Sequence, residues 1–374
     1  MRFTLSSSAL SSRLSVLSRV INSKNSLPIL DCFLFEVYNQ TLTITASDSE
    51  NVMRTTIVLD DQDGEGRFAV KNSTILDAVK ELPEQPLTID MDTNTLTIKV
   101  IYQNGIYNFT AQDANEYPTL QGMPEGVTVL TLPSAMLNDC INRSIFATAT
   151  EELRPVMNGI YFDLTADALA IVASDGHKLV RNRIYSIKSE TPSAFILPKK
   201  PATLLKNVLG KDESDVTVRF DERNAEIKFG DTLLLCRLIE GRYPNYNSVI
   251  PADNPNELTI DRKSLIGALR RVMPFASESS QLVRLHMETG RLVISSEDID
   301  FSTSAKEEIA CDYQGNTMNI GFKGPSLAEI LNNLQGEEVT LMLADPSRPC
   351  LIVPNEQPED QDILMLIMPM LLND

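Results

Sequence analysis

The chain has 374 residues, with 51 acidic side chains against 33 basic ones and a net charge of −18 at pH 7. This length allows two or three domains, and the acidic balance ordinarily argues against nucleic acid as a partner, because phosphates are negative too. The five cysteines are scattered and form no C-x-x-C pair, and no apolar run reaches the roughly 18 residues of a membrane span. The sequence predicts a soluble, cytoplasmic protein with reduced, buried thiols.

One short pattern occurs three times at nearly equal intervals. The copies read LTITASD, LAIVASD and LVISSED and begin at Leu42, Leu169 and Leu292. Seven residues before each of these leucines stands another apolar residue of a strand-like run, namely Phe35, Phe162 and Leu285. Such self-similarity indicates three equivalent domains, which we place at residues 1–122, 123–254 and 255–374.

Each third begins with a helical pattern and contains a second one. Leu10, Leu14, Leu17 and Ile21 follow one another at steps of three or four residues, which predicts one buried face of a helix. The same spacing predicts further helices at residues 75–82, 137–145, 204–209, 265–272 and 327–334.

Two alternating strand patterns around a polar turn follow each second helix. They begin at Leu87, Val216 and Val339 and predict hairpins. Prolines near residues 118 and 251 mark the expected domain boundaries. The predicted fold class is therefore α+β, with three repeated domains that each pack two helices against sheets.

Basic residues are concentrated in selected helical segments. Residues 5–24 and 198–211 contain no acid, and residues 261–271 contain Asp261 alone. For any one of these helices, chance clustering of basic residues is about as good an explanation as function. The recurrence of basic helices in several repeats favours a protein face that contacts phosphates. The chain lacks tryptophan, so sequence-independent contact with a duplex backbone is expected in preference to base stacking. The basic residues are Arg13, Arg19, Lys24, Lys199, Lys200, Lys206, Lys211, Arg262, Lys263, Arg270 and Arg271.

Five motifs in this order resemble the bacterial sliding clamp family, the beta subunit of DNA polymerase III. They are SLPIL (26–30), RPVMNG (154–159), SDGHKL (174–179), EGRYPNY (240–246) and MPM (368–370). The resemblance extends from Met1 to Leu372. It implies a DNA-clamp fold in which two chains join head to tail into a six-domain ring, with twelve helices inside, sheets outside and duplex DNA encircled.

The resemblance also implies a function and partners. The protein would be a processivity factor that tethers the DNA polymerase III alpha subunit, and it would bind the clamp loader and other polymerases and repair proteins through short peptides. By the match of motifs, the peptide-binding pocket comprises Met157, Ser174, Gly176, His177, Lys178, Leu179, Pro244, Val249, Ser347, Leu366, Ile367, Met368, Pro369 and Met370. The chain departs from the family pattern at Ser248, Lys323 and Ser326 and in a tail that continues to Asp374.

The same resemblance assigns the remaining sites. Lys24 and Arg154 match DNA-contacting positions, where we add Arg19, Lys199, Lys200 and Lys206 as basic helix residues. Ser73 and Glu151 occupy two other such positions with altered chemistry. Dimer contacts are expected from Tyr107 and Phe109 against Phe275.

Two other classes of function stay open. A repeat-built peptide scaffold would never enclose DNA, and a hydrolase could use Asp175 with His177 as an acid–base pair. No activated nucleophile accompanies that pair, and the only other histidine is His286, so a histidine-based metal site lacks ligands. There is no glycine-rich phosphate loop. We expect no enzymatic activity, no cofactor and no metal.

Overall fold

A computed structural model describes residues 1–22, 24–118, 122–151, 153–211 and 214–372 of the chain. Within these residues every helix that the sequence predicts is present, two in each third. The helices are α1 (Ser7–Leu17), α2 (Asn72–Val79), α3 (Ser134–Ser144), α4 (Lys199–Val208), α5 (Arg262–Val272) and α6 (Gly324–Asn333).

Helix α1 is shorter than its apolar pattern suggested. It ends at Leu17, and the N–H groups of Arg19 and Val20 bond to carbonyls only three residues back. This tighter turn directs Val20 into the core, where it is fully buried, and leaves Ile21 outside the helix.

The strands alternate with these helices in the same order in each third. The first third contains β1 (Arg2–Ser6), β2 (Cys32–Tyr38), β3 (Thr41–Ser47), β4 (Asn51–Val58), β5 (Asp61–Asp63), β6 (Gly66–Lys71), β7 (Pro86–Asp92), β8 (Thr97–Tyr102) and β9 (Gly105–Thr110). The second contains β10 (Thr128–Pro133), β11 (Gly159–Leu164), β12 (Leu169–Ser174), β13 (Lys178–Ile184), β14 (Ser193–Pro198), β15 (Asp215–Phe220), β16 (Asn224–Phe229) and β17 (Thr232–Arg237). The third contains β18 (Asn256–Asp261), β19 (Leu282–Glu288), β20 (Arg291–Asp298), β21 (Thr303–Ala310), β22 (Asp312–Tyr313), β23 (Met318–Lys323), β24 (Glu338–Leu343), β25 (Cys350–Pro354) and β26 (Gln361–Ile367).

The recurring sequence forms the same hairpin three times. Strands β2 and β3, β11 and β12, and β19 and β20 pair antiparallel, with partners at the same offset along the chain. The equivalent buried pairs are Phe35 with Ile44, Phe162 with Ile171, and Leu285 with Ile294. The predicted hairpins after the second helices, β7–β8, β15–β16 and β24–β25, are also confirmed.

The chain divides into two compact units, residues 1–138 with 203–238 and residues 139–202 with 239–374. The first contains a five-stranded sheet, in the order β5-β1-β7-β8-β9, and an eight-stranded sheet, in the order β10-β15-β16-β17-β4-β3-β2-β6. The second contains a nine-stranded sheet, β14-β11-β12-β13-β26-β25-β24-β18-β22, and a four-stranded sheet, β21-β20-β19-β23. Since β4 pairs with β17 and β13 with β26, strands of the middle third complete sheets in both units.

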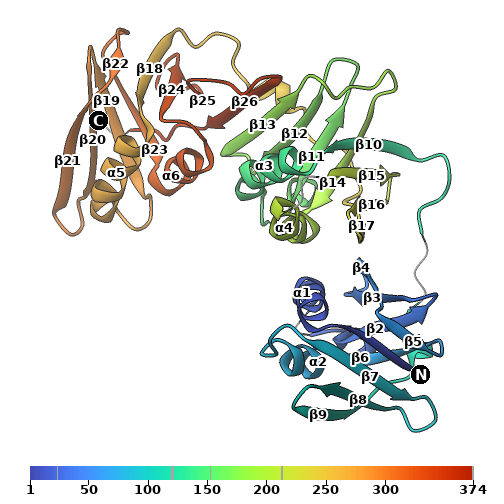
Figure 1. Ribbon diagram of the computed structural model, residues 1–374. Coiled ribbons are helices and arrows are strands. Elements are labelled where there is room, and N and C mark those ends of the chain that lie inside the picture. Colours follow the sequence, from blue (N-terminus) through green and yellow to red (C-terminus); the bar gives the residue numbers. More distant parts are fainter. Residues whose placement is uncertain (23, 119–121, 152, 212–213, 373–374) are drawn as a thin grey trace. The chain divides into compact units, whose positions relative to one another are not determined.

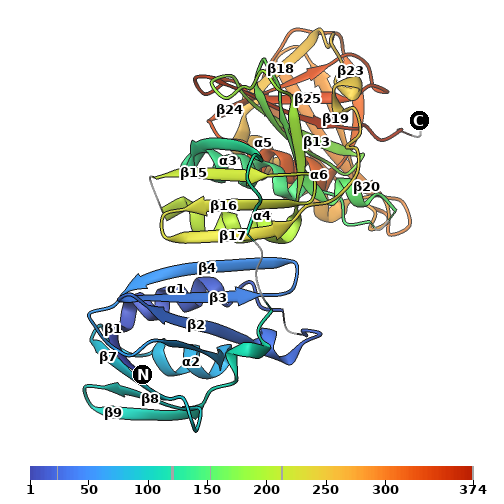
Figure 2. The ribbon, with the colours of Figure 1, turned by 90° about the vertical axis from the view of Figure 1, so that its right-hand side faces the viewer.

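Helix pairs pack against the sheets of the first and last repeats. In the first third α1 contacts α2, β1 and β4, and Figure 1 shows the two helices side by side. Figure 2 shows them behind the strands of the same third. The buried rings of Phe3 and Phe35 pack against Phe68, with ring centroids 6.5 and 5.2 Å away. In the last third α5 contacts α6, β20 and β21, so the two outer repeats bury their apolar helix faces in the same way.

Candidate functional site

The S-D-G-H motif forms a rigid turn between β12 and β13. Oδ1 of Asp175 accepts the backbone N–H groups of His177 and Lys178, each at 2.9 Å. The N–H of Gly176 donates to Oγ of Ser174 at 3.1 Å, and that hydroxyl donates to the carbonyl oxygen of Lys178 at 2.9 Å. Gly176 has φ +91°, a conformation that L side chains rarely adopt. The turn therefore holds an exposed His177 at a fixed place.

Asp175 does not serve as the partner of a catalytic histidine. Its Oδ1 is occupied by two backbone amides, and its Oδ2 lies 3.2 Å from Nζ of Lys178. Within the described part of the chain, no hydrogen bond joins the imidazole of His177 to this carboxylate. The geometry is that of a turn and gives the hydrolase alternative no support.

Lys178 lines the site, but neighbouring carboxylates compensate the positive charge of its ammonium group. Its side chain is almost fully buried, and Nζ lies 3.1 Å from Glu329 and 5.8 Å from the ring centre of Phe146. Burial disfavours its charged form, but the carboxylates of Asp175 and Glu329 outweigh this and raise the pKa of the ammonium. The positive charge is thus neutralised inside the protein.

The C-terminal strand completes the site from the other side. In the pairing of β13 with β26, Leu179 lies opposite Leu366 and Lys178 opposite Ile367. Pro369 then ends regular pairing, as expected for a residue without an N–H group. Met368 is 38% exposed immediately after the strand. The methionine that follows the proline is held by a 2.7 Å hydrogen bond from the N–H of Met370 to the carbonyl of Gly321.

A tyrosine cluster supports the floor from below. Leu179 and Leu366 belong to the same buried cluster as Tyr243 and Tyr246 of the E-G-R-Y-P-N-Y motif. The ring of Tyr161 stacks on Tyr243 with centroids 4.6 Å apart. Burial and the nearby Asp163 carboxylate raise the pKa of Tyr246 to about 12, and its hydroxyl donates to that carboxylate at 2.8 Å. The floor of the site therefore rests on a layer of packed aromatic side chains.

The fourteen predicted pocket residues divide into floor and rim. Buried are Met157, Ser174, Lys178, Leu179, Leu366 and Ile367; half-buried are Pro369 and Met370; exposed are Gly176, His177, Pro244, Val249, Ser347 and Met368. Hydrogen bonds and strand pairing bring the members of β12, β13 and β26 together. Ser347 instead bonds to Asp345 in its own turn. Together, the residues of β12, β13 and β26 and the methionines that follow combine a largely apolar floor with unbranched, adaptable side chains, which suits recognition of varied peptides.

The predicted DNA-contacting residues lie on the surface of separate elements. Lys24 is exposed in a bend, Arg19 is exposed just after α1, and α4 carries Lys199, Lys200 and Lys206. Arg154 lies 3.6 Å from Glu151 in an exposed ion pair. Its guanidinium also rests against the S-D-G-H turn, because a Cβ placed on Gly176 would meet Nη1 at 2.9 Å.

The residues predicted for a dimer interface lie at strand edges. Tyr107 and Phe109 are half-buried on β9, the edge strand of the five-stranded sheet, and the ring of Tyr107 lies 4.9 Å from Tyr102. Phe275 is 41% exposed in a short 3₁₀ turn, Met273–Phe275, which contacts β21. Strand β21 is likewise the edge of its sheet. Such edges present backbone groups that can pair with another chain.

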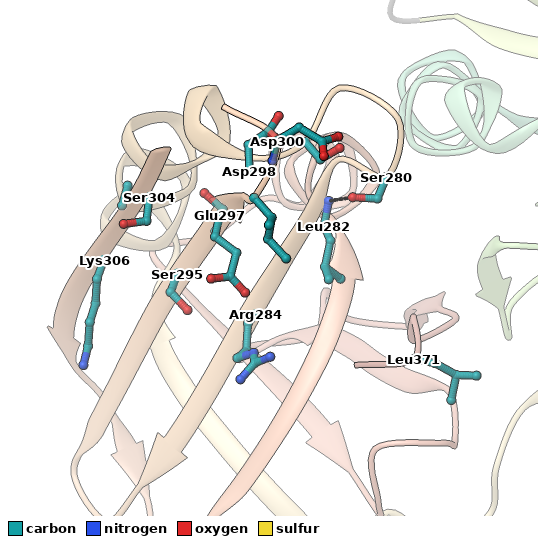
Figure 3. A pocket seen from close by; sticks show the side chains of 14 residues that line it. Ser280, Leu282, Arg284, Ser295, Glu297, Asp298, Asp300, Ser304, Lys306 and Leu371 are labelled. Carbon is teal, nitrogen blue, oxygen red and sulfur yellow. Dashed lines mark hydrogen bonds between the residues drawn. The ribbon is translucent and has the colours of Figure 1, made fainter. Parts of the chain in front are cut away.

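A hollow of about 620 Å³ opens on the outer face of the four-stranded sheet. Figure 3 shows Arg284, Glu297 and Lys306 on this face, with Leu371 of the tail at its border. None of the fourteen pocket residues lines it. Its cations are accompanied by Glu297, Asp298 and Asp300, so its lining favours no single ligand charge.

Sequence reasoning missed a buried arginine beneath the site. Nε of Arg143 on α3 donates to Asn182 of β13 at 2.8 Å, and its Nη2 donates to Gln361 of β26 at 3.2 Å. Asn182 in turn donates to Oγ of Ser144 at 2.9 Å. These bonds tie α3 to the two strands whose pairing forms the floor. In the sequence Arg143 resembled any basic residue near a helix end, and no signal marked it.

The described His, Cys, Asp and Glu side chains form no group of three that could hold a metal ion. Burial raises the pKa of the Cys32 and Cys140 thiols to about 11 and of Cys236 to about 12.

Among the helices in the ranges given above, none has the length and apolar character needed to cross a membrane.

Almost the whole chain matches the sequences of known proteins. Sequence models of the DNA polymerase III beta subunit match with their N-terminal domain at residues 1–121, their central domain at 131–245 and their C-terminal domain at 247–371. The beta sliding clamp of Pseudomonas putida is 27% identical over 373 residues, which cover 100% of both chains. That of Bacillus subtilis is 26% identical over 379 residues, which cover 99% of each.

Solved structures give the same result. The sliding clamp (DNA polymerase III subunit beta) from Pseudomonas aeruginosa bound to griselimycin superposes with a TM-score of 0.93 and 25% identity, covering 100% of both chains. The DNA polymerase III beta subunit from Thermotoga maritima superposes with a TM-score of 0.90 and 26% identity, again over 100% of both chains. The three repeats are therefore three DNA-clamp domains.

Proposed function

The chain belongs to the DNA polymerase III beta subunit family, and we propose that the sites described above equip it for the work of that family. Its function is that of a sliding clamp, a processivity factor of DNA replication without enzymatic activity. The family encircles DNA and interacts with polymerase. Membership of this family favours a DNA-encircling clamp over a repeat-built peptide scaffold that never encloses DNA.

We place the domain boundaries at residues 122 and 254. Two copies of the three domains form the dimeric ring known for the family. We assign the contact between chains to two of the sheet-edge strands, β9 with Tyr107 and Phe109, and β21 with the adjacent Phe275. Head-to-tail pairing of unlike edges closes into a ring when the rotation between copies suits. Backbone bonds between the edges would supply the register, and the aromatic side chains the apolar burial.

The encircled partner is double-stranded DNA, contacted without reading its sequence. Lys24, Arg154, Arg19, Lys199, Lys200 and Lys206 supply the positive charge. Enclosure explains how a chain with a net charge of −18 stays on DNA. A ring needs only weak attraction to phosphates, and weak attraction leaves sliding unopposed.

The floor and rim around Met368 and the S-D-G-H turn form a pocket for short peptides. Candidate owners of such peptides are the DNA polymerase III alpha subunit, the clamp loader, and other polymerases and repair proteins. Two relatives, from Pseudomonas aeruginosa and Bartonella birtlesii, were solved bound to griselimycin, which supports a ligand-binding pocket in the family. We place this work in the cytoplasm.

The observation that carries the proposal is the threefold recurrence of one domain across a chain that matches the three clamp domains from residue 1 to 371. A primer-extension assay tests it. With its cognate loader, ATP and polymerase, the protein should lengthen the products made in a single binding event. Products of unchanged length would contradict the proposed function.

A further inference from the structure

A second hollow, of about 470 Å³, lies in the first unit beside helix α1. It is bounded by the exposed face of α1, by the turn that joins β16 to β17, and by the end of α4. We call it the α1 groove. Its principal polar side chains are those of Arg13, Arg19, Thr55, Asn207 and Asp231.

The exposed face of α1 is suited to close approach by a polyanion. The helix buries Leu10, Leu14 and Leu17 and turns small hydroxyl side chains outward. Ser12 and Ser15 donate to backbone carbonyls of their own helix, at 2.9 and 2.7 Å, so they project little into the groove. The helix itself carries no acidic residue. The helix itself therefore places no acidic side chain in the path of a phosphate.

One carboxylate opposes the two cations. Asp231 is the single acid among the described residues that line the groove, and its Oδ2 lies 3.4 Å from Nη2 of Arg13. The two side chains are 66% and 39% exposed. An ion pair this accessible contributes roughly 0–1 kcal/mol. A phosphate, which an arginine can bind with two parallel hydrogen bonds, can compete for the same guanidinium.

The carboxylate is held in place by its turn. Gly230 takes φ +50°, which permits the tight connection between Phe229 and Thr232. The hydroxyls of Thr232 and Thr55 lie 3.3 Å apart and anchor the turn to β4. Asp231 thus meets Arg13 because the hairpin end is fixed there.

The groove belongs to the basic surface to which DNA contacts are assigned above, and we propose that Asp231 is the built-in counter-charge of that surface. Arg13 binds Asp231 when no phosphate is present and exchanges it for a phosphate when DNA passes. Arg19 supplies the second positive charge. The exchange keeps the net attraction small, which a clamp that slides requires. The inference rests on the proposed function and adds the regulation of its DNA-contacting surface.

The test is the salt dependence of binding to a short linear duplex, measured by fluorescence anisotropy at low salt. Each phosphate contact contributes a slope of about 0.9 in log K against log salt. Arg13→Ala should reduce the slope by about that amount, and Arg13→Lys should preserve most of it. Asp231→Asn should tighten binding severalfold, whereas the double variant should bind like Arg13→Ala.

A matched control is the Arg219–Glu226 ion pair on β15 and β16, which has a 3.0 Å contact and does not line the groove. Arg219→Ala and Glu226→Gln make the same charge changes, and they should alter the slope less. An unchanged slope in Arg13→Ala would overturn the phosphate site. Equal tightening by Asp231→Asn with and without Arg13 would overturn the counter-charge. If the protein stays on circular DNA and leaves linear DNA while these measurements fail, the clamp function stands and only this inference is lost.

Discussion

The backbone N–H of Met368 donates a hydrogen bond to the carbonyl oxygen of His177 at 2.8 Å. This bond joins the end of β26 to the turn between β12 and β13. The two bonded residues are 191 positions apart in the sequence (368 − 177) but meet at one site. Because it is a backbone bond, it survives changes of either side chain. The methionine side chains can therefore be altered without loosening the frame that presents them.

Loss of the methionine side chains should weaken peptide binding. Met368→Ala with Met370→Ala removes the apolar wall above the floor, and we expect at least tenfold weaker binding of a fluorescent clamp-binding peptide, equivalent to about 1.4 kcal/mol.

Deletion of residues 368–374 should abolish peptide binding and leave the dimer intact, since the assigned interface lies at β9 and β21. A truncated chain that elutes as a monomer would show that this division of sites is wrong.

Gly176→Ala should cost stability and disturb the pocket. The residue has φ +91°, and a Cβ there would meet Nη1 of Arg154 at 2.9 Å. Gly290→Ala is the matched control, because φ is +70° but a Cβ meets no atom within 4 Å. Both variants should lose about 1 kcal/mol in urea unfolding. Only Gly176→Ala should also weaken peptide binding; equal peptide affinity in both would contradict the role given to this turn.

Local patterns predicted much of the fold. The recurrence of Leu42, Leu169 and Leu292 correctly indicated three equivalent hairpins, since strand pairing within a hairpin depends on nearby residues. The pairing of β4 with β17 and β13 with β26 was not predicted, because partners so distant in the chain leave no local signal. The end of α1 before Ile21 was missed for a related reason: burial of Val20 overrode the apolar period.

Side-chain roles were harder to predict than elements. Lys178 was expected to line the pocket, and the structure shows its ammonium buried between Asp175 and Glu329. Arg143 gave no sign in the sequence of its buried bonds to Asn182 and Gln361. Whether a cation faces water or a carboxylate depends on tertiary packing, which composition and period do not encode. The last two residues of the tail, up to Asp374, lie outside the described residues.

Reversal of charge at three predicted DNA contacts should shorten retention on DNA. The change of Lys24, Arg154 and Lys200 to glutamate replaces attraction to phosphates by repulsion. The dimer should persist, as measured by light scattering. The control reverses Lys99, Lys188 and Lys228, which are exposed and lie outside the helices. Retention equal to that of wild type would defeat the assignment.

Removal of the buried arginine should destabilise the second unit. Arg143→Ala leaves the amide groups of Asn182 and Gln361 without their donor, and an unsatisfied buried acceptor costs about 1–3 kcal/mol. Arg223→Ala, at an exposed position, should change the unfolding free energy by less than about 0.5 kcal/mol. Similar urea midpoints for the two variants would show that the network contributes nothing.

Alkaline pH should lower stability through the buried thiols. Burial raises the pKa of Cys236 to about 12, whereas the pKa of a thiol in the unfolded chain is about 8.5. The folded state keeps the proton that the unfolded state releases, so stability is full below the unfolded pKa and falls as pH rises toward 12. Urea midpoints at pH 7 and pH 10 should differ less in Cys236→Ala than in wild type. An identical difference in both would exclude this thiol as a source of the effect.

The most direct test of the clamp is topological. The protein is loaded onto nicked circular DNA with its cognate loader and ATP, washed with salt, and half of the sample is then cut once with a restriction enzyme. We predict that the protein stays on the circles and leaves the linear DNA by sliding off the ends. Equal retention on both forms would mean ordinary surface binding and would contradict enclosure of the duplex.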